Sequence, residues 1–198
     1  MSISEINIDL FRMVNNLGKG LTYLNPTIVF VAKYMVFLLA LAVIAFWFTR
    51  SKNNRMMIIC GSITFVLAEI IGKIFGKIYS NNPPFAELSH VNHLIDHEID
   101  NSFPSDHTIL FFSFCITFFL FKKRSRIFWI MIAILVGLSR IWAGVHYPAD
   151  VIVGAAISIL VAILVYKVVP KLNVVRKLIA IYEKGEQTVL NKTRSKEN

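Results

Sequence analysis

The sequence predicts an all-α fold: a polytopic membrane helical bundle with about five transmembrane spans and an interfacial amphipathic helix at each end. Three observations support this class. Hydrophobic residues make up 56% of the 198 residues, whereas soluble domains are about 45–50% apolar. Charged residues make up only 17%. The run 28–48 carries a single charge, Lys33, and a soluble core of this size could not bury runs of that length.

We expect one domain, in which residues 1–24 form an interfacial helix, 25–169 a five-span bundle and 170–198 a basic segment. In the first part, apolar residues recur at helical spacing opposite acidic and polar ones, a pattern typical of a helix that lies in the membrane interface. A crossing would need a longer apolar run. The apolar residues of this predicted helix are Ile3, Ile6, Leu10, Met13, Val14 and Leu17.

Five longer apolar stretches fill the central part. A span needs roughly 17–25 residues, and the third and fourth stretches are short. We expect both to continue into the polar motifs beside them, which would put reactive side chains at helix ends near the membrane surface. After Pro170, a basic segment with apolar residues on one face predicts a second interfacial helix. The stretches are 25–48, 56–79, 105–121, 127–141 and 148–169.

The distribution of basic residues predicts the orientation, because Lys and Arg in short loops stay on the cytoplasmic side. Basic residues occupy the loops after the first and third stretches and the segment after the fifth. Between Lys77 and Lys122 there is no Lys or Arg, and acidic residues gather instead. We therefore expect the N-terminus and the acidic loop outside and the C-terminus in the cytoplasm. This placement accounts for the net charge of +9 without nucleic-acid binding.

The polar segment before the third stretch, Ser102-Phe103-Pro104-Ser105-Asp106-His107, has the pattern of a helix start. A Pro near the first helical position, preceded by a Ser that can cap, predicts unpaired backbone N–H groups at Ser105, Asp106 and His107. Such an end, with a hydroxyl and a titratable imidazole beside it, favours phosphate binding. The alternative is a well-capped helix with an incidental His.

A second polar motif joins the fourth and fifth stretches: Ser139-Arg140, then five residues, then His146-Tyr147-Pro148-Ala149-Asp150. A charge near hydrocarbon is costly, so Arg140 indicates a functional partner, and its planar fork of donors matches phosphate oxygens. Asp150 can accept from one nitrogen of His146 and leave the other free to attack. The structural alternatives are snorkelling of Arg140, a helix-dipole role for Asp150 and an interface-belt role for His146. Both motifs fall on the predicted outer side at adjoining helix ends, which favours the functional interpretation.

Together the motifs resemble those of the type 2 phosphatidic acid phosphatase family. The family motif P-S-G-H matches residues 104–107 with Asp106 in place of Gly, and S-R-x5-H-x3-D is matched in full at residues 139–150. The second match is specific, since it fixes four residue types at three spacings. The resemblance implies His146 as nucleophile, Asp150 as its orienter and His107 as general acid. It also implies Ser105 and Arg140 as phosphate ligands. We expect Ser139 and Asp106, which lie in the same two motifs, to belong to the substrate-binding residues as well.

The first family motif, K-x6-R-P, is imperfect in this chain. Pro83 stands where the Arg is expected and Gly76 where the Lys is expected. Lys77 is one position away, and Lys73 lies one turn before it. We expect Lys77, or failing that Lys73, to supply positive charge to the substrate; the alternative is that both snorkel at the end of the second stretch.

Within the family, the chain resembles the bacitracin-resistance undecaprenyl-diphosphate phosphatases over nearly its whole length. This implies hydrolysis of a polyprenyl diphosphate through a phosphohistidine, at the outer face of a bacterial plasma membrane and without a cofactor. His90, His93 and His97 of the acidic loop lack the spacing of a closed metal site, so a solvated loop and no metal are expected. Two alternatives stay open. One is a broad lipid phosphate phosphatase acting on phosphatidylglycerophosphate or phosphatidate, and the other is a catalytically silent lipid-binding protein.

Overall fold

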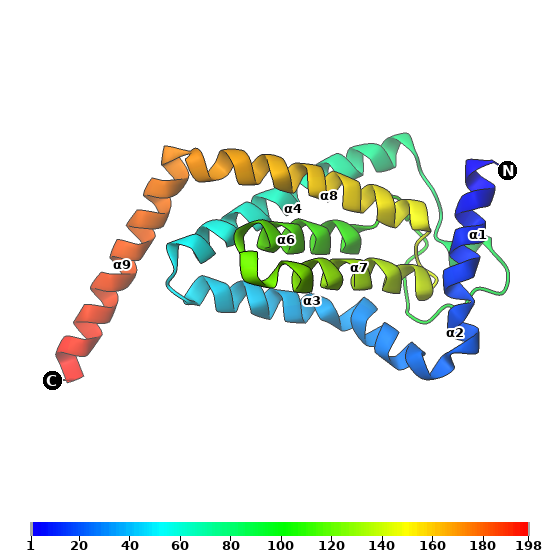
Figure 1. Ribbon diagram of the computed structural model, residues 1–198, viewed down its shortest axis with the longest axis horizontal. Coiled ribbons are helices and arrows are strands. Elements are labelled where there is room, and N and C mark those ends of the chain that lie inside the picture. The colour runs from blue at the N-terminus through cyan, green and yellow to red at the C-terminus, as the bar shows by residue number, and fades with distance from the viewer. Residues whose placement is uncertain (1, 198) are drawn as a thin grey trace.

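The computed structural model describes residues 2–197, with side chains described up to residue 188. Within these residues the chain consists of helices and loops, which confirms the predicted all-α class. Five long helices form a bundle, and α1 and α9 lie at its opposite ends (Figure 1). The helices are α1 (Ile3–Asn15), α2 (Leu17–Gly20), α3 (Asn25–Phe48), α4 (Lys52–Ile78), α5 (Pro84–Glu87), α6 (Asp106–Phe121), α7 (Arg126–Trp142), α8 (Pro148–Val168) and α9 (Asn173–Glu197).

The predicted spans correspond to α3, α4, α6, α7 and α8, and α6 differs from the others. It has 16 residues, which gives about 24 Å of helix against about 30 Å of hydrocarbon. Ten of these 16 residues are buried, whereas α3 buries three of its 24. α6 is therefore the central helix, surrounded by the others. The segments long and apolar enough to cross a membrane are the remaining four: Thr22–Phe48, Lys52–Ile78, Lys123–Trp142 and Pro148–Lys171.

Glycines on α4 bring the segment before α6 into place. A Cβ on Gly72 would lie 2.7 Å from the side chain of Ile109, and one on Gly76 would lie 2.7 Å from the backbone oxygen of Phe103. The carbonyl of Gly76 accepts a hydrogen bond from the Asn101 side chain (2.8 Å). Small residues at these positions let the backbones approach closely, so α4 fixes the chain that leads into α6.

α1 crosses one end of the bundle, which we term the site end (Figure 1). The buried ring of Phe11 packs on Tyr147, with ring centroids 5.5 Å apart. The buried amide of Asn15 donates to the carbonyl oxygens of Asn92 (3.0 Å) and Trp142 (2.8 Å). These contacts fix α1 to the loop before α6 and to the end of α7. Four other large apolar residues of α1 are exposed, as expected of a helix in an interface: Ile3, Ile6, Leu10 and Met13.

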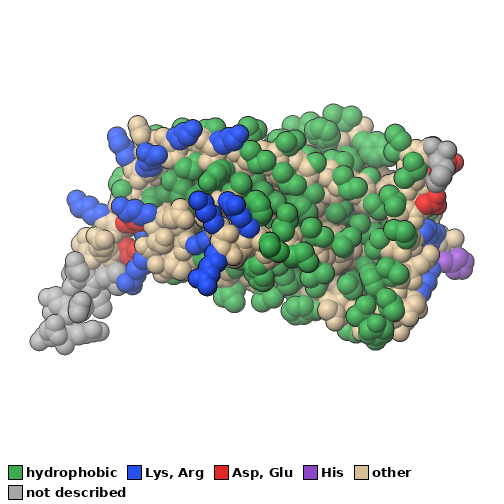
Figure 2. All heavy atoms as spheres, in the orientation of Figure 1, with side chains coloured by type: hydrophobic (Ala, Val, Ile, Leu, Met, Phe, Trp, Pro, Cys, Tyr) green, Lys and Arg blue, Asp and Glu red, His purple; other side chains and the backbone are tan. Residues whose placement is uncertain are grey.

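α9 leaves the opposite end at an angle to α8 (Figure 1). Its anchor is Arg55 of α4, which is 1% exposed and lies 2.5 Å from Glu186 and 3.3 Å from Glu183. Most of the Lys and Arg side chains visible in Figure 2 lie in this half of the molecule, and hydrophobic side chains cover much of the remaining visible surface. The basic loops thus share one end of the bundle, as the predicted alternation of spans requires.

Candidate active site

The two sequence motifs meet at the site end. The backbone N–H of Ser105 donates to the carbonyl of Asp150 (3.2 Å), which ties the start of α6 to the first turn of α8. Between α7 and α8, Gly144 has φ +84°, where a side chain would be strained. A Cβ there would also lie 2.7 Å from the side chain of Val91. Glycine at this position therefore lets the chain turn from the end of α7 back to His146.

His146 lies in that turn and is 4% exposed. Its Nδ1 is 3.0 Å from the carbonyl oxygen of Ser102. Because a carbonyl can only accept, Nδ1 carries the proton and Nε2 keeps its lone pair. Burial lowers the pKa of His146, and the nearby Arg140 charge lowers it further, against an opposing effect of Asp150. In the neutral imidazole Nε2 is the nitrogen with a free lone pair, which is suited to nucleophilic attack.

Asp150 organises the residues around His146 and is 1% exposed. Its Oδ2 accepts from the hydroxyl of Ser102 (3.0 Å) and from the backbone N–H of Tyr147 (2.8 Å). The same oxygen is 3.6 Å from Nδ1 of His146, beyond hydrogen-bond distance. The expected direct hydrogen bond between Asp150 and His146 is therefore replaced by one through the Ser102 carbonyl.

Sequence reasoning missed this role of Ser102, which it took as a possible helix cap. The cap is Ser105 instead, whose hydroxyl accepts from the backbone N–H of Thr108 (3.4 Å). The expectation of an unpaired N–H at Ser105 is also wrong, because that group donates to Asp150. The signal that could have identified Ser102 is its position within the motif segment, five residues before His107.

Arg140 is buried at the end of α7, with 2% of its surface exposed. Its Nη1 donates to the carbonyl of Ala32 in α3 (3.0 Å), and its buried Nε has no hydrogen-bond partner in the described chain. Snorkelling does not explain such a side chain. A buried charged donor left unpaired is costly, so the free part of the guanidinium is suited to an anionic ligand.

His107 and Asp106 form the first turn of α6; His107 is half-buried and Asp106 is exposed. Arg140, His146 and His97 lie close enough to His107 for their charges to interact with that of its imidazole. The predicted general acid therefore lies near the predicted nucleophile. Asp106, which stands where the family has Gly, interacts electrostatically with the guanidinium of Arg140. The first turn of α6 therefore faces the end of α7, as the two motifs together predicted.

The other predicted substrate ligands are engaged elsewhere or lie beside the site. The hydroxyl of Ser139 donates to the Val136 carbonyl of its own helix (2.6 Å). Lys73 pairs with Glu69 at 3.7 Å, and its side chain is 72% exposed. A separate hollow of about 300 Å³ contains Lys73, Lys77 and Asp106, and its lining does not include His107, Arg140 or His146.

The acidic loop is not uniformly solvated, which corrects the prediction for one of its three histidines. His97 contacts His146, with ring centroids 5.5 Å apart and an angle of 83° between the rings. His93 stacks on Phe85 at 4.1 Å, and His90 is exposed. Among the described residues, no group of three or more His, Cys, Asp or Glu side chains has the arrangement of a metal site.

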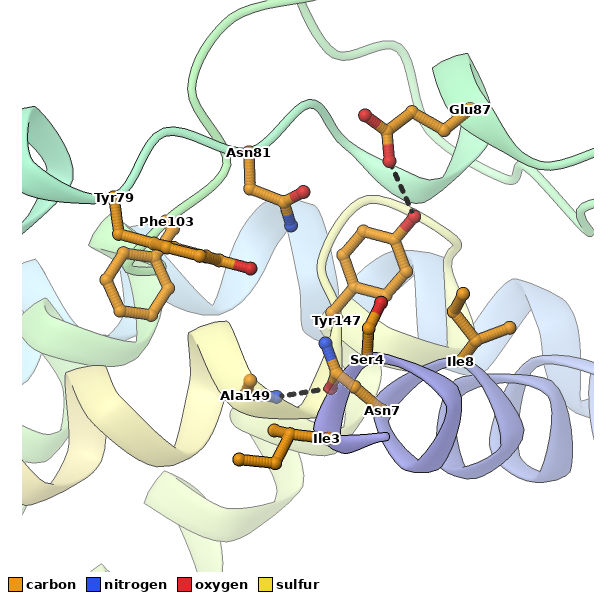
Figure 3. Close-up of a pocket in the computed structure, with 10 residues that line it drawn as sticks. All are labelled: Ile3, Ser4, Asn7, Ile8, Tyr79, Asn81, Glu87, Phe103, Tyr147 and Ala149. Atoms are coloured by element: carbon orange, nitrogen blue, oxygen red, sulfur yellow. Dashed lines mark hydrogen bonds between the residues drawn. The ribbon is translucent and has the colours of Figure 1, made fainter. Parts of the chain in front are cut away.

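A cavity of about 490 Å³ lies beside the site, between α1, the loops on either side of α5 and the start of α8 (Figure 3). Two of its hydrogen bonds link distant parts of the chain: the hydroxyl of Tyr147 donates to Glu87 (3.2 Å), and the N–H of Ala149 donates to Asn7 (3.0 Å). The lining of this cavity does not include His107, Arg140 or His146, but it includes Tyr147, the chain neighbour of His146. Its lining is Ile3, Ser4, Asn7, Ile8, Tyr79, Asn81, Glu87, Phe103, Tyr147 and Ala149.

Known proteins share both the sequence and the fold of this chain. It is 52% identical over 190 residues to the bacitracin transport permease protein BcrC of Bacillus licheniformis, covering 96% of this chain and 94% of that one. It is 31% identical over 165 residues to the undecaprenyl-diphosphatase BcrC of Bacillus subtilis (strain 168), covering 82% and 83%. Among solved structures, the crystal structure of Aquifex aeolicus LpxE is similar, with a TM-score of 0.60, 29% identity and coverage of 84% of this chain and 99% of that one.

A family profile described as the PAP2 superfamily matches residues 55–173. This range includes most of α4 and all of α6, α7 and α8, and it contains both motifs. Because the profile covers more than half of the chain and agrees with relatives along nearly its whole length, this protein belongs to the PAP2 superfamily, the phosphatase family that its motifs resemble.

Proposed function

We propose that this chain hydrolyses undecaprenyl diphosphate to undecaprenyl phosphate and inorganic phosphate at the outer face of the bacterial plasma membrane. The reaction would recycle the carrier lipid of the cell wall. It would also confer bacitracin resistance, because bacitracin sequesters the same diphosphate. The names of the two Bacillus relatives support this substrate and this phenotype.

One observation carries the chemistry. The hydrogen bond from Nδ1 of His146 to the Ser102 carbonyl leaves Nε2 as a nucleophile, and the partly unpaired guanidinium of Arg140 acts on the same imidazole. A neutral, oriented imidazole beside a buried cation is suited to attack on a phosphoryl group.

In the proposed mechanism, Nε2 of His146 attacks the terminal phosphorus. The bond from phosphorus to the bridging oxygen breaks, His107 gives its proton to that oxygen, and the lipid monophosphate leaves. Water then attacks the phosphohistidine, its proton passes to His107, and the phosphorus–nitrogen bond breaks to release inorganic phosphate. Arg140 and the N–H groups at the start of α6 stabilise the equatorial oxygens throughout.

The proposal also places the lipid. The cavity beside the site is lined mainly by apolar and aromatic side chains and adjoins His146 through Tyr147 (Figure 3). It is suited to the first isoprene units, while the diphosphate lies at the catalytic side chains. Lys73 and Lys77 line a hollow together with Asp106, so their positive charges lie close to the start of α6. There they attract the anionic headgroup before it binds.

The test is phosphate release by the purified full-length protein in detergent micelles. Undecaprenyl diphosphate, phosphatidylglycerophosphate and phosphatidate are compared side by side, with His146→Ala and His107→Ala as variants. We expect the diphosphate to be the best substrate and His146→Ala to abolish turnover. Equal rates on all three lipids would indicate a broad lipid phosphate phosphatase. No phosphate release from any lipid would indicate a lipid-binding protein without catalysis.

A further inference from the structure

His97 belongs to the loop that connects α5 and α6, and it covers part of the buried nucleophile. Its ring meets that of His146 edge to face, with centroids 5.5 Å apart. Phe85 contacts the His97 ring at 6.4 Å and 65°. His97 is partly exposed, whereas His146 is 4% exposed. The loop histidine therefore lies at the solvent side of the site, held between the nucleophile and an aromatic side chain of α5.

The hydrogen bonding of His97 leaves one nitrogen available. Nδ1 lies 2.9 Å from the carbonyl oxygen of Glu98, and since a carbonyl only accepts, Nδ1 carries a proton. None of the hydrogen bonds formed by the described residues uses Nε2. When the ring is protonated, Nε2 becomes a charged donor that is free for a ligand.

A diphosphate substrate would be bound more tightly if the site supplied a second positive charge. A diphosphate carries more negative charge than a single guanidinium neutralises, and Arg140 is the arginine that acts on His146. Lys73 is paired with Glu69 and lies with Lys77 in the separate hollow. His97, by contrast, interacts electrostatically with both His107 and His146. A phosphoryl group bound between those two side chains would therefore lie close to the His97 ring.

We propose that His97 is a substrate-binding residue: its imidazolium donates from Nε2 to an oxygen of the phosphoryl group that His146 attacks. This inference rests on the proposed function, since it assigns a further ligand to the same reaction. The negative charge of the bound substrate balances the added positive charge. Three acidic residues lie close to His97 in the sequence of the same loop: Asp96, Glu98 and Asp100.

The test compares three substitutions that separate charge from packing. His97→Phe keeps an aromatic ring against His146 but removes the donor, His97→Gln keeps a neutral donor, and His97→Arg keeps a cation. Loss of a hydrogen bond to a charged group raises KM by about tenfold or more, so we expect that increase for His97→Phe with kcat within about threefold of the unmodified protein. His97→Arg should restore KM to within about threefold, and His97→Gln should lie between.

His93→Phe is the matched control, because His93 belongs to the same loop and stacks on Phe85 at 4.1 Å without contacting His146. It should leave KM unchanged. Binding of orthovanadate, followed by calorimetry, gives a second measurement that needs neither lipid substrate nor turnover. We expect His97→Phe to weaken it by about tenfold.

The outcomes distinguish this inference from the proposed function. An unmodified protein that releases no phosphate from undecaprenyl diphosphate refutes the proposed function, and the effect of His97→Phe on orthovanadate binding then decides the inference by itself. An active protein in which His97→Phe keeps both its KM and its orthovanadate affinity refutes the inference alone. The same conclusion follows if His97→Arg is as impaired as His97→Phe, because a loss insensitive to charge indicates packing.

Discussion

Nδ1 of His146 lies 3.0 Å from the backbone oxygen of Ser102, closer than the 3.6 Å to Oδ2 of Asp150. His146, the proposed nucleophile, is thus oriented by a carbonyl, and the carboxylate acts one step away by accepting from the Ser102 hydroxyl at 3.0 Å. Ser102 is therefore a positioning residue: its two polar groups connect the acid and the imidazole of the second motif.

Ser102→Ala keeps the carbonyl and removes the hydroxyl that Asp150 holds. We expect kcat to fall by about tenfold or more, the effect typical of supporting residues around a reactive group, while KM stays within about twofold. The measurement is steady-state phosphate release from undecaprenyl diphosphate. Ser102→Thr, which retains a hydroxyl, should recover part of the loss.

Ser80→Ala provides the control for this change, because Ser80 is an exposed serine in the neighbouring segment between α4 and α5. It should behave as the unmodified protein. If Ser102→Ala turned over at the full rate, the carbonyl alone would be sufficient to orient His146, and the Asp150 contact would have only a structural role.

Arg140→Lys keeps a positive charge but removes the planar fork that both holds Ala32 and faces the site. A lysine cannot make the two contacts at once, so we expect kcat/KM to fall by about 10²-fold or more. Arg126→Lys is the matched control, since Arg126 lies at the opposite end of α7 and bonds to the Phe119 carbonyl (3.2 Å). Near-normal activity in Arg140→Lys would show that charge without geometry is sufficient.

The pH dependence follows from the lowered pKa of His146. Burial is the largest cause, and the Arg140 charge adds to it. Since the neutral imidazole is the nucleophile, the acid limb of kcat/KM that belongs to His146 should lie below about 6.5, the usual value for histidine. Activity should therefore persist as the pH falls through that value.

The same shift has a consequence for stability, with a defined sign. Below about pH 6.5 the unfolded chain binds a proton at His146 that the folded protein does not bind there. The free energy of unfolding therefore declines as the pH falls below that value, whereas above it His146 causes no such loss. His146→Gln should reduce this decline in a thermal unfolding series. An acid limb of kcat/KM above 6.5 would contradict the assignment of a neutral, buried nucleophile.

The sequence was sufficient for the long helices and for the placement of the two motifs at helix ends, because both depend on local patterns. The long apolar runs defined α3, α4 and α8 to within a few residues. The spacing of Arg140, His146 and Asp150 around a helix end predicted that these three side chains lie near one another. Local periodicity and capping preferences carry this information directly.

What the sequence did not reveal depends on contacts between distant segments. Ser102 meets Asp150 across 48 positions, and His97 meets His146 because the loop folds back over the site. A loop sequence has no periodicity that indicates which of its residues turns inward. The same limit applies to the central position of α6: the sequence predicted a short apolar helix, but its burial depends on contacts with the helices around it.

The proposed outer-face location can be tested by the accessibility of introduced cysteines, because Cys60 and Cys115 are both buried. Ser89→Cys places a thiol on the exposed loop at the site end, and Arg124→Cys places one in an exposed basic loop at the opposite end. The excess of Lys and Arg favours the cytoplasm for the basic loops. We therefore expect a membrane-impermeant maleimide to label Ser89→Cys in intact cells and Arg124→Cys only after permeabilisation. The unmodified chain should stay unlabelled in both conditions. The reverse pattern would put the site in the cytoplasm, and hydrolysis at the outer face would be excluded even if every catalytic residue were assigned correctly.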